Sequence, residues 1–299
     1  MNFESLNTAV AKLFNHIFRT GEFPEQWKTA IITPILKQNP KHPSSYRPIS
    51  ILPFLSKVFE KILSCTLYKH TSSKMSQTQF GFRNHLSTSH ALANFTQTVH
   101  NELDKNQVVA AVYYDLTKAF DLVDHEKLIS RLETVYKIPS HILNIVKSYL
   151  QNRQFKIKLN GKISEAYPLL VWVPQGSCLG PLLFNLAFDD VDTSLTDATK
   201  IVKYADDIGC IISGTSIDSV TATIVKCTEK LDQWCNQNHM KLNYSKTKYM
   251  FFKYARSKRD LSKIQQSLCI NVTVYFSKYL LRKFFRVFTK FIPVGPVPT

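Results

Sequence analysis

The stretch KIVKYADDIGCII, residues 200–212, places two adjacent aspartates, Asp206 and Asp207, between two short apolar runs. Each run has the length and apolar character of a buried β-strand, so the stretch predicts a hairpin with the acids at its tip. Adjacent carboxylates repel each other, and each loses hydration if it is buried. The acids therefore lie either at an exposed turn without a role, or beside a third acid with a positive charge between them.

A third acid follows the clearest strand of the sequence. Residues 108–114 are apolar throughout, and Asp115 stands directly after them. If this strand and the hairpin share one sheet, Asp115 and Asp206 come close together. Carboxylates so placed would bind divalent cations through oxygen, and Mg²⁺ suits a site that substrate phosphates complete. Two such ions, roughly 3.5–4 Å apart, would activate an attacking hydroxyl and stabilise a leaving pyrophosphate oxygen.

Other acids near apolar segments have simpler explanations. Asp121 and Asp124 fit a turn and a helix start, where aspartate is a common cap or turn residue. Asp189 and Asp190 follow an amphipathic helix, and we expect both to face solvent. For these four aspartates we therefore expect structural or solvent-exposed roles and no catalytic role.

Charge and cysteine usage narrow the classes of function. Among the 299 residues, Lys and Arg number 38 against 22 Asp and Glu, giving a formal net charge of +16. Such an excess indicates a polyanionic partner, nucleic acid first and an acidic membrane second. The six cysteines form no C-x-x-C pair, which argues against a disulfide framework or a zinc site. With no signal peptide and no spanning apolar run, we expect an intracellular protein of the nucleus or cytoplasm, not a secreted one.

The remaining patterns alternate helices and strands. Pro34 predicts that residues 29–37 form an edge strand or an extended segment, and the three prolines of residues 38–50 predict a loop. A hairpin is expected to turn at Asn160 and Gly161. Helices are expected over 1–20, 54–70, 87–104, 124–136, 140–150 and 217–239, and a last strand over 247–253. This order predicts an α+β fold with an antiparallel sheet, compatible with a ferredoxin-like core.

Several segments resemble known motifs in their known order. YYDLTKAFDLVDH, VPQGSCLGPLLFNL, YADD and LDQWCNQNHMKLNYSKTKYMFF resemble successive motifs of reverse transcriptases. Upstream, GEFPEQWKTAIITPILK, SYRPISILPFLSKVFEKIL and QFGFRNHLSTSHAL resemble the segment that precedes them in non-LTR retrotransposons. The likeness runs from about Leu13 to Phe252. The chain is therefore similar to the reverse transcriptase domain of non-LTR (LINE-type, jockey-like) retrotransposons.

The resemblance implies a right-hand polymerase, with a palm built on a ferredoxin-like antiparallel sheet with helices, plus fingers. Residues 1–20 would be an N-terminal helix continuing from a longer protein, 21–110 the fingers, and 111–253 the palm with the catalytic motifs. Residues 254–299 form a basic, aromatic tail, so that the thumb is missing or degenerate.

The implied activity is RNA-directed DNA polymerisation. Its partners would be an RNA template, a DNA primer and deoxynucleoside triphosphates, with two Mg²⁺ ions (or Mn²⁺ in their place) and no membrane. A second hypothesis is a truncated retroelement remnant, weakly active or inactive, that only binds nucleic acid. A third, an RNA-dependent RNA polymerase with the same palm, is disfavoured by the aromatic residue Phe120.

The family's catalytic roles carry over by position. Asp115 and Asp206 match the two metal-binding aspartates, Asp207 matches the supporting acid, and the carbonyl of Leu116 would also face a metal. Lys246 matches a lysine proposed as the general acid for pyrophosphate departure, although a surface lysine explains it equally well.

The nucleotide-binding roles carry over in the same way. Phe120 matches the residue under the incoming sugar, where an aromatic ring excludes a 2′-hydroxyl; an ordinary core phenylalanine is the simpler explanation. Gln175 matches a residue near the nucleotide and template, and Gly176 either permits close approach of the backbone or simply forms a turn. Lys37 and Arg47 match basic residues of the fingers that hold the triphosphate, or are solvated loop cations.

Overall fold

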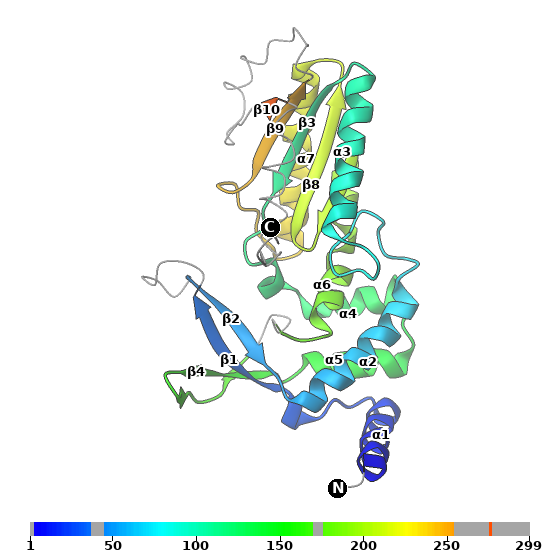
Figure 1. Cartoon of the computed structure of the whole chain (residues 1–299), viewed down its shortest axis with the longest axis vertical. Helices are drawn as coiled ribbons and strands as arrows, with labels where there is room; N and C mark the ends of the chain where they lie inside the picture. The colour runs from blue at the N-terminus through cyan, green and yellow to red at the C-terminus, as the bar shows by residue number, and fades with distance from the viewer. Residues whose placement is uncertain (1–2, 37–44, 170–175, 254–274, 277–299) are drawn as a thin grey trace, which may run out of the picture. The chain divides into compact units, whose positions relative to one another are not determined.

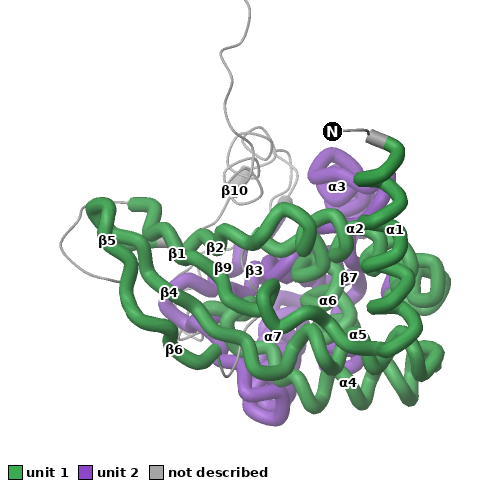
Figure 2. The backbone as a smooth tube through the Cα atoms, turned by 90° about the horizontal axis from the view of Figure 1, so that it is seen from below, with its two compact units in different colours: residues 1–75, 118–189 green, residues 76–117, 190–299 purple. Residues whose placement is uncertain are grey.

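A computed structural model describes residues 3–36, 45–169, 176–253 and 275–276. It divides into two compact units, each made of two separated stretches of chain (Figure 2). Unit 1 comprises residues 1–75 and 118–189, and unit 2 comprises residues 76–117 and 190–299. The expected division into fingers (residues 21–110) and palm (residues 111–253) stays a prediction.

Unit 2 is built on a five-stranded sheet (Figure 1). The strands β3, β7, β8 and β9 pair antiparallel, while β10 pairs parallel to β9. Their order across the sheet is β10-β9-β3-β8-β7. The bounds are β3 Val108–Tyr114, β7 Lys200–Tyr204, β8 Asp207–Gly214, β9 Lys248–Lys253 and β10 Tyr275–Phe276.

Two helices of unit 2, α3 (Thr88–Asp104) and α7 (Ile217–Gln237), pack on this sheet. Side chains of α3 form one core with alternate residues of β3, among them Phe95, Val99, Val109, Ala111 and Tyr113. On α7, the Thr228 hydroxyl lies 3.0 Å from the Tyr114 hydroxyl. Because alternate residues of β3 contact different helices, β3 is buried at every position, which explains its unbroken apolar run.

Unit 1 combines helices with a second sheet, whose central strand β1 pairs antiparallel with β2 and parallel with β4. An aromatic cluster of Phe14, Phe23, Trp27, Phe59 and Tyr149 forms much of its core. The helices are α1 Phe3–Thr20, α2 Phe54–Thr71, α4 His125–Thr134, α5 Ser140–Leu150 and α6 Gly180–Ala187. The strands are β1 Thr29–Leu36, β2 Tyr46–Ile51, β4 Gln154–Leu159, β5 Lys162–Ile163 and β6 Tyr167–Pro168, and the short 3-10 helices are η1 Glu25–Trp27 and η3 Ala119–Leu122. A further 3-10 helix, η4 Asp189–Leu195, has its first residue in unit 1 and the rest in unit 2.

The predicted helices and the two hairpins are confirmed, with ends shifted by a few residues. Two expectations for the first sheet are wrong. Residues 46–51 form strand β2 rather than a loop, and β1 is a central strand rather than an edge. Both prolines are tolerated because Pro34 lies opposite Pro48, and the β4 ladder ends before Pro34, at Ile32.

Residues 38–44 of the predicted loop and nearly all of the tail, 254–274 and 277–299, lie outside the described residues. The expectation of a missing or degenerate thumb falls on this tail and is likewise outside them. In the part of the chain that is described, no helix is both long and apolar enough to cross a membrane.

Candidate active site

Three aspartates of unit 2 gather at one end of its sheet. In the β7–β8 hairpin Tyr204 pairs with Asp207, so that Ala205 and Asp206 form the turn. Strand β3 runs antiparallel to β8, with Tyr114 opposite Ile208. Continued by one residue, this register sets Asp115 beside Asp207. The backbone thus brings together the acids that the sequence singles out, whereas their roles stay predictions.

The backbone of Asp115 is fixed by the segment before β9. Its N–H donates to the Thr247 hydroxyl at 3.4 Å, and its carbonyl accepts from the Asn243 N–H at 2.8 Å. Leu116 and Leu242 form an isolated antiparallel bridge. On either side of this bridge, the Asn243 N–H donates to the Asp115 carbonyl and the Thr117 N–H donates to the Lys241 carbonyl, each at 2.8 Å. Neither bond uses the Leu116 carbonyl.

The side chain of Lys246 forms an ion pair with Asp115. Its Nζ lies 3.7 Å from Asp115 Oδ1, and its side chain is 64% exposed against 22% for that of Asp115. An ion pair so open to water contributes little to stability, about 0–1 kcal/mol. Lys246 therefore lies next to Asp115, but its side chain is mostly exposed to solvent.

The described side chains do not form a complete metal site by themselves. Among the residues that the structure describes, no group of three His, Cys, Asp or Glu side chains is arranged to hold a metal ion alone. Mg²⁺ commonly takes one or two carboxylates from the protein and completes its shell with water and substrate phosphates. The register brings Asp115 to the same end of the sheet as Asp206, and their role as ligands of such an ion stays a prediction.

The other candidates that are described lie in unit 1. Phe120, in η3, is half-buried and stacks on Phe184 of α6, with ring centroids 4.0 Å apart. Arg47 lies in β2, paired in register with Ile35. Lys37 and Gln175 fall outside the described residues.

Gly176 is required by a close approach within the chain itself. Its φ is +120°, and a Cβ at this position would come within 2.5 Å of the Ser50 carbonyl oxygen of β2. Both the backbone conformation and the lack of space favour glycine. The glycine therefore sets the loop before α6 directly against strand β2.

A buried carboxylate holds the same loop, and the sequence analysis missed it. Glu60 of α2 accepts hydrogen bonds from the hydroxyls of Ser56 (2.8 Å) and Ser177 (2.6 Å) and from the Cys178 N–H (2.9 Å). The Ser177 hydroxyl uses its one hydrogen in the bond to Glu60. In its contact with the Tyr149 hydroxyl, at 2.8 Å, Ser177 is therefore the acceptor and Tyr149 the donor. Burial, and next the Glu60 charge, raise the pKa of the Tyr149 hydroxyl and keep it protonated. Glu60 thereby ties α2 to the loop that follows Gly176.

We predict that Glu60→Gln lowers the stability of the chain by about 1–3 kcal/mol, because an amide NH₂ would face a donor that now meets an acceptor. The urea midpoint of the variant measures this loss. Glu133→Gln, at an exposed position of α4, is the matched control and should leave the midpoint unchanged. Equal midpoints for both variants would contradict an anchoring role for Glu60.

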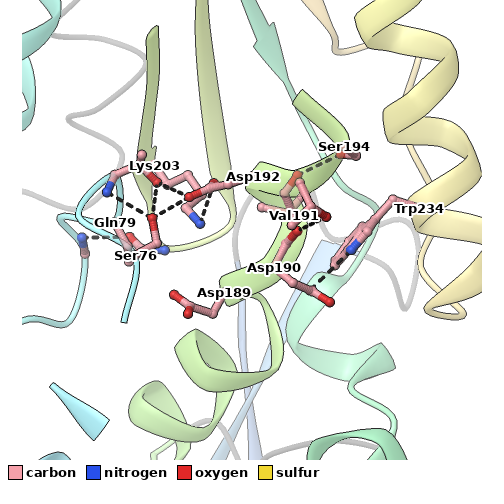
Figure 3. A network of polar contacts seen from close by, with 12 residues as sticks. Ser76, Gln79, Asp189, Asp190, Val191, Asp192, Ser194, Lys203 and Trp234 are labelled. Atoms are coloured by element: carbon pink, nitrogen blue, oxygen red, sulfur yellow. Dashed lines mark hydrogen bonds and ion pairs between the residues drawn. The ribbon is translucent and has the colours of Figure 1, made fainter. Parts of the chain in front are cut away.

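The acids after α6 differ from expectation. Asp189 and Asp190 do not simply face solvent. Asp189 accepts from the Tyr136 hydroxyl at 2.8 Å. Asp190 accepts from Trp234 Nε1–H at 3.3 Å (Figure 3). Burial, and next the Asp189 charge, raise the pKa of Tyr136. Asp124 is confirmed as a cap, since its carboxylate accepts from two backbone N–H groups at the start of α4.

A buried ion pair in unit 2, between Lys203 and Asp192, was also not predicted from the sequence. Lys203 of β7 is fully buried, and its Nζ lies 2.8 Å from Asp192 Oδ1. The available signal was a lysine in the interior of a short strand next to apolar residues, because a buried cation needs an acidic partner. Lys203 lies two residues before Ala205, the first residue of the turn that carries Asp206.

Comparison with known proteins gives consistent matches. The sequence model of the family described as reverse transcriptase (RNA-dependent DNA polymerase) matches residues 35–274. The chain is 32% identical over 248 residues to the probable RNA-directed DNA polymerase from transposon BS of Drosophila melanogaster, covering 80% of the chain and 27% of that protein. It is 30% identical over 247 residues to the RNA-directed DNA polymerase from mobile element jockey of the same species, covering 79% and 27%. The chain thus spans about a quarter of the length of these curated relatives.

Solved structures share the fold at low sequence identity. Apo telomerase from Candida tropicalis, truncated from its C-terminal domain, matches with a TM-score of 0.58 and 14% identity, over 86% of this chain and 56% of that one. Telomerase from Candida albicans, in complex with a TWJ fragment of telomeric RNA, matches with a TM-score of 0.55 and 15% identity, over 82% and 46%. These likenesses confirm the predicted α+β class with a palm-type sheet.

Proposed function

The chain belongs to the reverse transcriptase (RNA-dependent DNA polymerase) family, and from that premise we propose that it is the polymerising part of a non-LTR retrotransposon protein. In this proposal it extends a primer 3′-hydroxyl with deoxynucleotides copied from RNA. The observation that carries it is the strand register that sets Asp115 beside Asp207, the residue next to Asp206 of the β7–β8 turn. The names of the relatives, RNA-directed DNA polymerases of mobile elements, support the same activity.

We propose that Asp115 and Asp206 hold two Mg²⁺ ions, with Asp207 in support and the Leu116 carbonyl as a further oxygen; Mn²⁺ would fit the same oxygens. When bound, such ions activate the attacking hydroxyl and stabilise the charge of the leaving pyrophosphate. Lys246, whose Nζ lies 3.7 Å from Asp115 Oδ1, would give a proton to that pyrophosphate. The simpler role for Lys246 is that of a counter-charge to Asp115.

The substrate contacts are proposed from position in the family. Lys37 and Arg47 would hold the triphosphate, Gln175 and Gly176 would lie near the nucleotide and template, and Phe120 would lie under the sugar. The excess of 16 positive charges supports an RNA template and a DNA primer as partners.

Primer extension tests the proposal. The chain is incubated with a primed RNA template, Mg²⁺ and either deoxy- or ribonucleotides, and the products are resolved by length. Extension with deoxynucleotides is the expected result. A chain that binds the primed template but does not extend it would instead be a remnant that only binds nucleic acid.

We predict that Phe120→Val lowers the preference for deoxynucleotides over ribonucleotides roughly 10- to 200-fold, since the smaller side chain opens space for a 2′-hydroxyl. The ratio of kcat/KM for the two nucleotide types measures this preference. Phe54→Val, at a side chain that is 77% exposed, is the control and should keep the parent ratio. If Phe120→Val lowers only the urea midpoint, through its lost stacking on Phe184, the ring is a core residue.

A further inference from the structure

The turn that carries Asp206 contains a residue with an unfavourable backbone conformation. Ala205, the first turn residue, has a φ of +56°, in the left-handed region that non-glycine residues rarely adopt. Hairpin turns with a positive φ at this position normally use glycine. Something outside the hairpin must therefore stabilise this turn.

The side chain of Gln79 supplies two hydrogen bonds to that residue. Its Oε1 accepts from the Ala205 N–H at 3.0 Å, and its Nε2 donates to the Ala205 carbonyl at 3.1 Å. The same Oε1 accepts from the Gly81 N–H at 2.8 Å, and Gln79 is only 2% exposed. One buried amide thus binds both backbone groups of the residue that precedes Asp206.

Gly81 packs against the same turn from beside Gln79. A Cβ at this position would lie 2.3 Å from the Ala205 nitrogen and 3.1 Å from the Tyr204 carbonyl carbon. The nearest atoms are backbone and cannot rotate away. A side chain at position 81 would therefore displace the turn.

The segment that carries Gln79 is itself fixed to the sheet of unit 2. Lys203 N–H donates to the Thr78 carbonyl at 2.7 Å, and Phe80 N–H donates to the Lys203 carbonyl at 2.9 Å. The hydroxyls of Ser76 and Thr78 both donate to Asp192, which also pairs with buried Lys203 (Figure 3). Gln79 therefore reaches the turn from a rigid base.

We infer that Gln79 is a positioning residue, which with Gly81 holds the β7–β8 turn so that Asp206 and Asp207 are presented at the end of the sheet. The inference rests on the proposed function for its consequence, polymerisation, but its geometry lies wholly within unit 2. It predicts that loosening the turn weakens metal binding and slows chemistry, with little effect on nucleotide binding.

The test measures Mn²⁺ affinity by titration calorimetry on the full chain bound to a dideoxy-terminated primer on its template and the matching deoxynucleotide. In parallel, kcat and KM are determined for single-nucleotide incorporation. Gln79→Met removes both hydrogen bonds to Ala205, and Gly81→Ala displaces the turn independently. For each variant we expect the Mn²⁺ dissociation constant to rise and kcat to fall about 10- to 100-fold, the usual effect of removing a residue that orients metal ligands. The nucleotide KM should change less than about threefold, because neither variant removes a group that binds substrate.

Two further variants separate positioning from general stability. Ser213→Ala removes the hydrogen bonds of the Ser213 hydroxyl with Glu102 and Thr199 near the far end of β8, and should leave Mn²⁺ affinity and kcat at parent values. Adding Ala205→Gly to Gln79→Met should recover part of the Mn²⁺ affinity, because glycine adopts the turn without strain. Parent Mn²⁺ affinity in both Gln79→Met and Gly81→Ala would overturn the inference, whatever their urea midpoints. A chain that binds Mn²⁺ but extends no primer would refute the proposed function alone.

Discussion

Asp115→Asn and Asp206→Asn should each lower the rate of nucleotide incorporation on the order of 10³-fold or more, the size of loss seen when a residue acting in the chemical step is removed. Each change removes one negative charge from the end of the sheet and leaves the side-chain volume nearly the same. The fold should survive, since the ion pair that the structure records for Asp115 is the exposed one with Lys246, worth about 0–1 kcal/mol. The measurement is single-turnover primer extension, with template binding and the urea midpoint determined beside it.

Asp218→Asn is the matched control for this pair. Asp218 is exposed in the first turn of α7, so the same chemical change is made on the same unit, outside the proposed site. It should extend primers at the parent rate. Extension by Asp115→Asn or Asp206→Asn at more than a small fraction of that rate would remove the residue from the catalytic role.

The elements that could be predicted are those whose pattern is local. The run at 108–114 is apolar at every position because helices pack on both of its faces, and such a run needs no tertiary knowledge to read. The turn at Asn160 and Gly161 is equally local, since both residues have positive φ. Strand β2 could not be read, because Pro48 argues against a strand unless its partner also places a proline opposite, as Pro34 does.

The candidate site divides along the same line. Asp115 and Asp206 stand at strand ends, and strand ends are visible in a sequence. The residues that hold them act across long stretches of chain: Gln79 binds Ala205, 126 positions away. No periodicity predicts such a contact, although the resemblance includes the segment in which Gln79 lies. Gly176 shows the same limit, because its need for glycine comes from the backbone of β2 and not from its own turn alone.

Affinity for a primed template should fall steeply with salt, because lysine and arginine side chains that meet phosphates release condensed counterions. Each phosphate contact adds about 0.9 to the slope of log affinity against log salt for duplex DNA, so six contacts would lower affinity about 10³-fold between 50 and 200 mM. With a net charge of +16, a slope of this size is expected from fluorescence-anisotropy titrations over that range. A slope near zero would contradict a nucleic-acid partner altogether.

Two double variants with the same change of net charge locate the cations that meet phosphate. Lys156 and Lys158 lie on β4, with Lys156 beside Ile31 of β1 in the sheet that also holds Arg47; replacing both by glutamine should reduce the slope by about 1.8, or 0.9 for each phosphate that is no longer neutralised. Lys226 and Lys230 lie on α7 and both pair with Asp197, at 2.7 and 2.5 Å. Because both cations already share one carboxylate, which offsets one of their two charges, replacing them by glutamine should reduce the slope less than replacing Lys156 and Lys158 does. Equal reductions in both variants would mean that net charge, and not the β4 surface of unit 1, sets the attraction to nucleic acid.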